Sequence, residues 1–468
     1  MYLSKKAFLL FISLLLVFSL VSCKSAETEQ TLTDGTELYE NSFSAVVKNG
    51  KAIITDCYIT EDVIVIPEKI EGVLVTEIGD EAFMHTNCKS IEMPDSIVRI
   101  GEKAFEGAFE LSDVKLSNSL KEIGNRAFYD VDTIENITFP LSLTIIGNEA
   151  FCDCDALASL MLPEALTEIG EKAFFSCDLI TNIHISENVK KIGADAFTSL
   201  AALQSFDVNS SNTEYEAIDG VLFNKGITEL IIYPKTKTES EYIIPNSVEK
   251  IYSYAFSENQ ALKTITLPTN LKEIGQSCFY NCKLLRDIVI PNGVTSIAPY
   301  TFANCEQLSQ VTIPSGVTLI DYSAFAGCKS LENVALPESL ISIGQNAFSG
   351  CYQAFQKLDI PANVTSIGDK AFYDCYFISE IRLPNTLKEI GELSFRGCLC
   401  LKTIEIPNSV TDIGKDAFLG CGNVDKVVNP DNDLPITALD TKAITLICNE
   451  NSYAYKYAQD YDIPVTLK

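Results

Sequence analysis

The chain has no tryptophan, only two histidines and four methionines among its 468 residues. Histidine is the side chain that most often serves in acid–base and metal chemistry near neutral pH, so little material is present for such a site. Positive charge is also scarce, because 35 Lys and Arg stand against 63 Asp and Glu, a formal net charge of −28. Nucleic-acid binding needs clustered positive charge, and the composition therefore excludes nucleic acid as the default partner.

Long hydrophobic runs are missing apart from one at the start. Lys5 and Lys6 precede the apolar run 7–21, which is shorter than the about 20 residues of a spanning helix and typical of a signal peptide. The run ends in Leu-Val-Ser-Cys at Cys23, which resembles the lipobox of bacterial lipoproteins. That resemblance implies cleavage after residue 22 and lipidation of Cys23, which anchors a protein stably once several acyl chains are attached. The polar residues 23–37 are predicted to form a flexible tether.

The remainder is one unit repeated at a period of 23, with the consensus LxxIxIPxxVxxIGxxAFxxC. An Ile followed five residues later by Phe occurs 14 times, from Ile78 and Phe83 to Ile413 and Phe418. Eleven of the 14 Ile are followed directly by Gly. Such regularity predicts stacked coils, since a 23-residue unit cannot bury its apolar face alone.

Each part of the repeat predicts one local structure. The alternating x-I-x-I/L stretch predicts a strand, which the Pro ends because proline cannot donate to a strand ladder. The V-x-x-I pair predicts a second short extended segment. The Gly is expected to permit a backbone turn that a Cβ would oppose, and Ala-Phe is expected to open a short helical turn with the Phe inside. The predicted fold is a leucine-rich-repeat solenoid of α/β type, with about 14 coils of short parallel strands and short helical turns.

This repeat resembles the BspA-like class of leucine-rich repeats over roughly residues 40–468. The resemblance implies a cell-surface lipoprotein of the bacterial envelope. It also implies a role in adhesion, or in binding host and microbial proteins.

Segments that depart from the 23-residue period indicate the boundaries of the caps and of an insert. Residues 38–77 alternate apolar and polar around Lys48-Asn49-Gly50-Lys51, which predicts a β-rich N-terminal cap with a hairpin. The solenoid is assigned to 78–429, with a strand-rich insert at about 209–246 that contains another hairpin turn and adds strands to the stack. Residues 430–468 are predicted to form a strand–helix–strand C-terminal cap, because terminal coils need covering.

Nine of the 16 cysteines occupy one repeat position, three residues after the Phe. Disulfides between neighbouring coils and a metal or redox ladder are the alternatives to a buried column of small apolar side chains. The column is favoured, because other coils carry Val131 or Leu200 at the same place and free Cys packs well in cores.

Neither His85 nor His184 lies in a triad or metal pattern, and no cofactor motif is present. The chain is therefore predicted not to be an enzyme.

The outward positions of the main strand, and those of the second extended segment, carry small, mostly uncharged side chains over the coils that contain residues 266–342. These positions are the candidate binding face: Thr266, Val289, Ser296, Thr312, Leu319, Ala335 and Ser342. Solenoids bind partners along such extended surfaces, although Thr and Val are also simply good strand residues.

The sequence thus predicts a membrane-anchored, surface-exposed lipoprotein whose solenoid binds a protein or glycan on a host or microbial surface. The alternative is a structural envelope scaffold that links surface proteins and has no host ligand.

Overall fold

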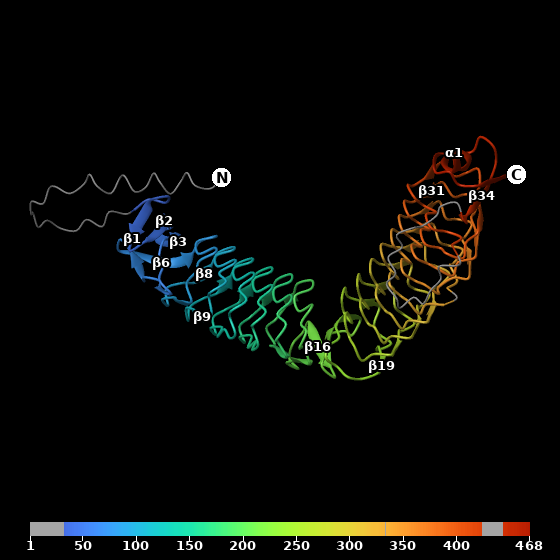
Figure 1. Cartoon of the computed structure of the whole chain (residues 1–468). Helices are drawn as coiled ribbons and strands as arrows, with labels where there is room; N and C mark the ends of the chain where they lie inside the picture. Colours follow the sequence, from blue (N-terminus) through green and yellow to red (C-terminus); the bar gives the residue numbers. More distant parts are fainter. Residues whose placement is uncertain (1–31, 333, 424–442) are drawn as a thin grey trace, which may run out of the picture.

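The computed structural model describes residues 32–332, 334–423 and 443–468, so the predicted lipidation site Cys23 and most of the tether lie outside the described residues. The described chain is a solenoid of about 17 turns, somewhat more than the 14 counted from the Ile–Phe repeat. Figure 1 shows two arms that meet at a bend near β16 and β19.

Most regular coils contribute one main strand, formed by the x-I-x segment, whereas the coils at residues 136–138 and 159–161 are joined there only by an isolated bridge between Asn136 and Ser159. Neighbouring main strands pair in parallel and in register, 23 residues apart in most coils. The main strands before the C-terminal cap are β4 (Val63–Val65), β7 (Ser90–Glu92), β9 (Asp113–Lys115), β13 (Asn182–Ile185), β15 (Ser205–Val208), β19 (Glu241–Ile243), β21 (Thr264–Thr266), β23 (Asp287–Val289), β25 (Gln310–Thr312), β28 (Lys357–Asp359), β30 (Glu380–Arg382) and β32 (Thr403–Glu405).

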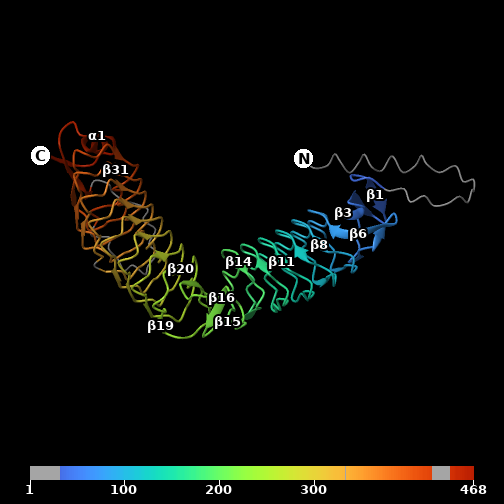
Figure 2. The same ribbon diagram turned by 180° about the vertical axis from the view of Figure 1, so that it is seen from behind.

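A second, shorter strand ends at the repeat Ile. The second strands form their own parallel ladders, and Figures 1 and 2 place β8, β11 and β14 along the inner side of the bend and β9, β15 and β19 along the outer side. The second strands are β6 (Val73–Ile78), β8 (Arg99–Ile100), β10 (Glu122–Ile123), β11 (Ile145–Ile146), β12 (Glu168–Ile169), β14 (Lys191–Ile192), β20 (Lys250–Ile251), β22 (Glu273–Ile274), β24 (Ser296–Ile297), β26 (Leu319–Ile320), β27 (Ser342–Ile343), β29 (Ser366–Ile367), β31 (Glu389–Ile390) and β33 (Asp412–Ile413).

The segment after the second strand is a chain of tight turns rather than a regular helix. In the first coil Ala82 N–H donates to Gly79 O and Met84 N–H donates to Glu81 O. Glu81 has φ = 60°, a left-handed conformation that cannot continue a right-handed helix. The corresponding residue of most other coils, such as Lys103, does the same.

The repeat Gly has a different role from the one predicted. Gly124 does not adopt positive φ, but a Cβ built on it would lie 2.7 Å from the carbonyl carbon of Gly101 in the preceding coil. Glycine is therefore needed for the close approach of two backbones, and the turn itself uses the residue two positions later.

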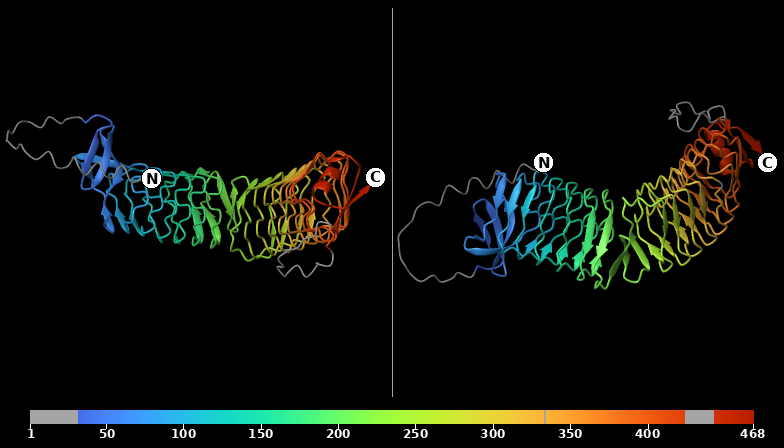
Figure 3. Two further views of the ribbon diagram at one scale, coloured as in Figure 1. Left: turned by 45° about the horizontal axis from the view of Figure 1, so that its top comes forward. Right: turned by 90° about the horizontal axis from the view of Figure 1, so that it is seen from below.

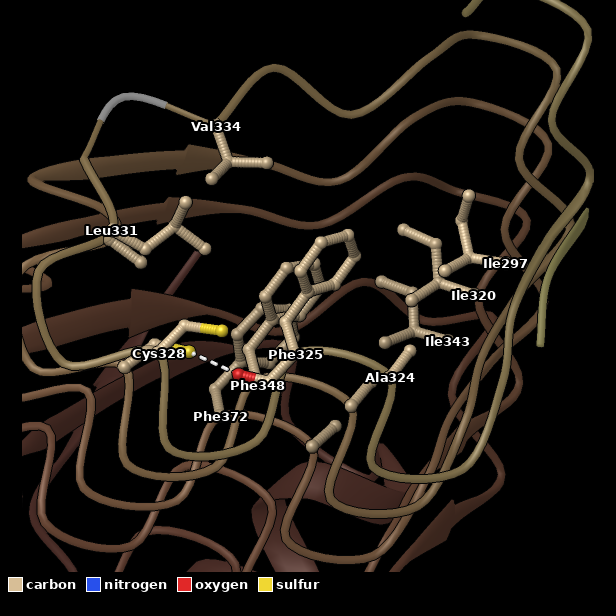
Figure 4. Packing of buried hydrophobic residues seen from close by; sticks show 14 of the residues in the cluster. Ile297, Ile320, Ala324, Phe325, Cys328, Leu331, Val334, Ile343, Phe348 and Phe372 are labelled. Atoms are coloured by element: carbon tan, nitrogen blue, oxygen red, sulfur yellow. Dashed lines mark hydrogen bonds between the residues drawn. The ribbon is translucent and has the colours of Figure 1, made fainter. Parts of the chain in front are cut away.

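Phe side chains form one continuous column in each arm. Phe325, for example, stacks on Phe302 at 5.2 Å and on Phe348 at 5.3 Å between ring centroids. The predicted cysteine column is confirmed as part of this core, because all nine repeat-position Cys are buried, and Figure 4 shows Cys328 beside the stacked rings. All 15 cysteines among the described residues are free thiols.

Each end of the described chain has strands of its own. At the N-terminus β1 (Glu37–Glu40), β2 (Phe43–Lys48) and β3 (Lys51–Cys57) form an antiparallel meander with Lys48 opposite Lys51. A small strand β5 (Lys69–Ile70) pairs with β6. The C-terminal cap contains β34 (Thr445–Cys448), α1 (Tyr453–Asp460) and β35 (Val465–Leu467); its predicted residues 430–442 lie outside the described residues.

The insert adds strands to the stack, as predicted. β16 (Tyr215–Ile218), β17 (Val221–Asn224) and β18 (Glu229–Ile232) form an antiparallel meander, and β18 then pairs in parallel with β20. The predicted hairpin segment is thus a strand, β17, with a turn on each side.

This insert also divides the hydrophobic core into two clusters. Leu222 belongs to the cluster of the N-terminal arm, whereas Val221 and Phe223 belong to that of the C-terminal arm. Because side chains alternate along a strand, β17 forms the wall between two separate cores.

Candidate functional site

A parallel sheet of four main strands on the outer side carries the main candidate surface. In β19, β21, β23 and β25 the central side chain points into the core and the last one points out. The register places Ile243 opposite Thr266 and Val289 opposite Thr312. The right panel of Figure 3 looks onto this outer side, where the main strands lie side by side.

The outward ends of these strands form an uncharged row that we name the outer strip. Ile243 is 73% exposed and Val289 is 67% exposed, values that are high for large apolar side chains. The outer strip consists of Ile243, Thr266, Val289, Thr312 and Ala335. Exposed apolar surface of this kind marks contact sites for partners more often than isolated exposed residues do.

The seven predicted face residues separate into two groups. Thr266, Val289, Thr312 and Ala335 lie on the outer strip and are exposed. The other three lie in a different sheet, on β24, β26 and β27: Ser296, Leu319 and Ser342. In Figure 4 the column Ile297, Ile320 and Ile343 lies on the opposite side of the Phe rings from Val334, so the predicted positions do not form one face.

A groove of about 520 Å³ adjoins the end of the outer strip. Val334, Ala335 and Leu336 line one side, and Leu358 and Ile360 of the next coil line the other. The repeat spacing from Ile343 to Ile367 is 24 rather than 23, so this coil holds one extra residue. The volume lies within the roughly 300–1,000 Å³ typical of ligand pockets.

Charged side chains on the far side of the groove neutralise one another. Lys357 Nζ lies 2.9 Å from Glu380 Oε2, and Arg382 lies 2.9 Å from Glu380 and 3.5 Å from Asp359. A partner that enters the groove therefore meets apolar walls and a rim of paired charges.

The histidines do not form a reactive site. His184 Nδ1 lies 2.8 Å from Asp207 Oδ2 across the adjacent strands β13 and β15, and both side chains are exposed. His85 packs against Phe109, with 6.5 Å between ring centroids. The first contact is a surface ion pair when His184 is protonated, and the second is a packing contact. Neither places a nucleophile beside the histidine, as a catalytic site would require.

The thiol column is chemically protected. Burial raises the pKa of the Cys328 thiol well above its usual range, which disfavours the reactive thiolate. Within residues 32–332, 334–423 and 443–468, no group of three or more His, Cys, Asp or Glu side chains could hold a metal ion.

Two features of the surface were not predicted. Ile243 belongs to the strand-rich insert, and no residue of the insert was placed in the outward row. The groove could have been found from the single 24-residue spacing between Ile343 and Ile367. No helix in the described part of the chain is both long and apolar enough to cross a bilayer.

Comparison with known families decides the relationship. The profile described as "BspA type Leucine rich repeat region (6 copies)" matches residues 76–204, 123–241, 231–354, 297–425 and 351–444. The chain belongs to the BspA-type leucine-rich repeat family. A comparison with curated proteins gives no match.

Solved structures show the same fold. A leucine rich cell surface protein from Faecalibacterium prausnitzii is 27% identical, with a TM-score of 0.57, and the match covers 74% of this chain and 94% of that protein. The pneumococcal vaccine antigen PcpA is 20% identical, with a TM-score of 0.54 over 93% of this chain and 100% of that one. A leucine-rich repeat protein from Eubacterium ventriosum is 23% identical, with a TM-score of 0.51 over 85% of this chain and 96% of that one.

Proposed function

We propose that this chain is a lipid-anchored surface protein that binds a protein partner through the outer strip and the adjoining groove. The observation that carries the proposal is the exposed, uncharged row from Ile243 to Ala335, which ends at a groove of about 520 Å³ lined by both apolar and charged residues. A solenoid builds an extended binding surface from such a row because each coil adds one position at a fixed spacing.

The rows on either side of the outer strip support this location. Earlier in the chain the outward position holds charges that pair between coils, such as Lys115 with Glu92. Later in the chain, Lys468 pairs with Glu405 at 2.6 Å. The strip is an uncharged row between two charged regions, and Glu241 and Asp287 flank it on the same strands. Interfaces likewise have an apolar centre and a polar rim.

Protein fits this surface better than glycan. A sugar ring carries a hydroxyl group on most of its carbons, and those groups need hydrogen-bond partners. The strip offers the methyl groups of Ile243, Val289 and Ala335, with hydroxyls only on Thr266 and Thr312. A partner segment with apolar side chains therefore buries more of its surface here.

We infer membrane anchoring from Cys23, and we infer display on the cell surface from the resemblance of the chain to surface proteins. Brief protease treatment of intact cells tests both, with a Cys23→Ala variant as the control. We expect loss of the wild-type chain without lysis and release of the Cys23→Ala chain from the membrane. Digestion only after lysis would overturn surface display and favour the envelope-scaffold alternative.

The binding surface is tested by placing a photo-crosslinking amino acid at Val289, with the same substitution at Ile341 as the matched control. Ile341 is 50% exposed and adjoins the second strand β27 on the inner side. We expect crosslinking on intact cells from position 289 and not from 341. Equal yields, or none from 289, would contradict the proposal, whereas a partner from the cell's own envelope would identify a scaffold.

A further inference from the structure

The bend contains a break in the stacking pattern. In the coil before it, the N–H groups of Lys172, Phe174 and Ser176 donate to the carbonyls of Ala194, Ala196 and Thr198. In the next coil the corresponding N–H groups are those of Asp195, Phe197 and Ser199. Those three have no hydrogen-bond acceptor among the described residues.

The insert explains this break. In β18 Leu230 takes the place of the repeat Ile, because it pairs with Ile251. Tyr233 takes the place of the repeat Phe, because its N–H donates to Ala255 O and its ring stacks on Phe256 at 4.9 Å. Tyr233 follows Leu230 by three positions, whereas the Phe follows the Ile by five in a regular coil, so this shortened turn provides no carbonyl acceptor for the Phe197 N–H.

A cleft lies where the coil is shortened, and we name it the junction cleft. Its main chamber has a volume of about 220 Å³ and is lined from both arms, including Ile192 and Asp195 on one side and Glu229 and Tyr252 on the other. Ile192 is half-buried, whereas the other 13 repeat Ile are buried. The chamber is smaller than most drug-sized pockets and limits an occupant to a small molecule or one side chain.

The charge of the chamber has one sign. Asp195, Glu214 and Glu229 line it, and no Lys or Arg does. None of these three carboxylates forms an ion pair within the described part of the chain, although the Tyr252 hydroxyl donates to Glu229 at 3.1 Å. Asp195 and Glu229 are partly buried, whereas Glu214 is exposed at the rim. A cation that donates hydrogen bonds to partly buried carboxylates stabilises them.

Polar groups without hydrogen-bond partners occur among the residues that line the junction cleft. Asp195 and Phe197, whose N–H groups lack acceptors, line the main chamber. A smaller chamber of about 20 Å³ shares Phe197 with it and is lined by Tyr233. The Tyr233 side chain is 2% exposed, and its hydroxyl has no partner among the described residues. Buried donors of this kind are rare, because each costs free energy when it is left unpaired.

We propose that the junction cleft binds an ammonium group that lies beside a carbonyl oxygen. The carboxylates of Asp195, Glu214 and Glu229 accept from the ammonium, and the N–H groups of Asp195 and Phe197 donate to the carbonyl. A free α-amino-acid amide carries the two groups on one carbon atom, whereas a lysine within a peptide carries its ammonium at the end of a flexible side chain that must fold back towards the backbone carbonyl. Because the walls come from both arms, the occupant joins them across the bend. The proposal does not depend on partner binding at the outer strip.

Calorimetric titration of the full chain with two probes tests the site and identifies the source. L-lysinamide represents a free amine, and acetyl-Ala-Lys-Ala-amide represents a lysine within a peptide. Acetyl-Ala-Gln-Ala-amide is the neutral control. We expect binding of at least one lysine probe and none of the glutamine peptide. Binding of lysinamide alone indicates a small metabolite, and binding of the peptide indicates a basic segment of a protein.

The variants locate the site. Glu229→Gln and Glu214→Gln are each expected to weaken binding about tenfold, the loss of one charge-assisted hydrogen bond. Glu214 is exposed, so its substitution leaves the fold intact. Glu216→Gln, in the adjoining strand β16 but outside the cleft, is the matched control and should bind as the wild type does. Absence of binding by both lysine probes, or equal effects of Glu214→Gln and Glu216→Gln, would overturn the proposal.

Discussion

The thiol of Cys328 donates a hydrogen bond to the carbonyl oxygen of Phe302 in the preceding coil, with 3.1 Å between Sγ and O. The same relation joins Cys154 to Phe128 and Cys421 to Phe395, at 3.1 Å in each case. One bond of this kind is dashed in Figure 4. The column therefore couples neighbouring coils as well as filling space, which explains why a small side chain with a donor recurs there.

The contribution of the thiol can be measured by Cys328→Ala. We expect a loss of about 1–2 kcal/mol in unfolding free energy, because a buried sulfur and its hydrogen bond are both removed. Cys400→Ala is the control, since Cys400 is half-buried and outside the column. Urea unfolding followed by circular dichroism gives both values, and equal stability of the two variants would show that the column thiols do not couple the coils.

The Phe column should be more sensitive than the thiol column. Phe325 is fully buried between two stacked rings, so Phe325→Ala should cost about 3–5 kcal/mol through the cavity that it leaves. Phe377 is 37% exposed, and Phe377→Ala should cost far less. Because the chain lacks Trp, tyrosine fluorescence and circular dichroism are the practical probes. Similar costs at both positions would contradict the role of stacking.

Substitution of two glycines can show how much stability depends on the close approach of neighbouring backbones, as distinct from the replacement of glycine by alanine in general. A Cβ at Gly368 would lie 2.5 Å from Gln345 N in the preceding coil, whereas the nearest atom to a Cβ at Gly316 is 3.6 Å away. Gly368→Ala is expected to cost about 1–3 kcal/mol, as overpacking does. Gly316→Ala should be near neutral or slightly stabilising. Thermal unfolding compares them, and equal midpoints would mean that the coils can separate at no cost.

Asp374 should make the fold more stable in mild acid. Burial raises the pKa of its carboxyl to about 6, although a hydrogen bond from Tyr376 acts in the other direction. The folded chain therefore holds this proton more tightly than the unfolded chain, whose Asp pKa is about 3.9. The penalty for the ionised form is present above pH 6 and is relieved as the pH falls from 6 towards 4.

Asp374→Asn removes that dependence. We expect the variant to be more stable than the wild type by about 1–2 kcal/mol at pH 7.5, with the difference shrinking as the pH falls to 4.5. Asn also tolerates the left-handed backbone at this position, where φ is 57°. A constant difference between the two proteins over this range would show that Asp374 does not titrate as described.

Periodicity alone predicted which side chains enter the core. Phe325 and Ile343 are buried, and Val289 is exposed on the next face of the coil, because position within the repeat decides burial. Periodicity assigned Val289 and Ser296 to two extended segments but could not show that these segments lie on opposite sides of the Phe column, since that depends on how the coil closes. The reason for the repeat Gly could not be predicted either, because it depends on the distance between its backbone and the backbone of the preceding coil.

The junction cleft was beyond prediction for another reason. The YP segment at Tyr233 does not match the repeat, and only pairing of Leu230 with Ile251 shows that it replaces the Ile–Phe unit with a shorter one. The insert was correctly predicted to add strands. The shortened unit has two residues fewer than the regular one, and it leaves the N–H groups of Phe197 and its neighbours without acceptors. Both facts can be seen only from the pairing of the strands in three dimensions.

The partition of the core at β17 has a mechanical consequence. Leu222 faces one core while Val221 and Phe223 face the other, so a pulling force along the chain meets two structures that yield separately. Stretching between an anchored end and a bound partner would extend the molecule in two steps. The arm that remains folded keeps its own surface in place while the other lengthens, so the proposed binding surface in the C-terminal arm would stay intact while the N-terminal arm extends.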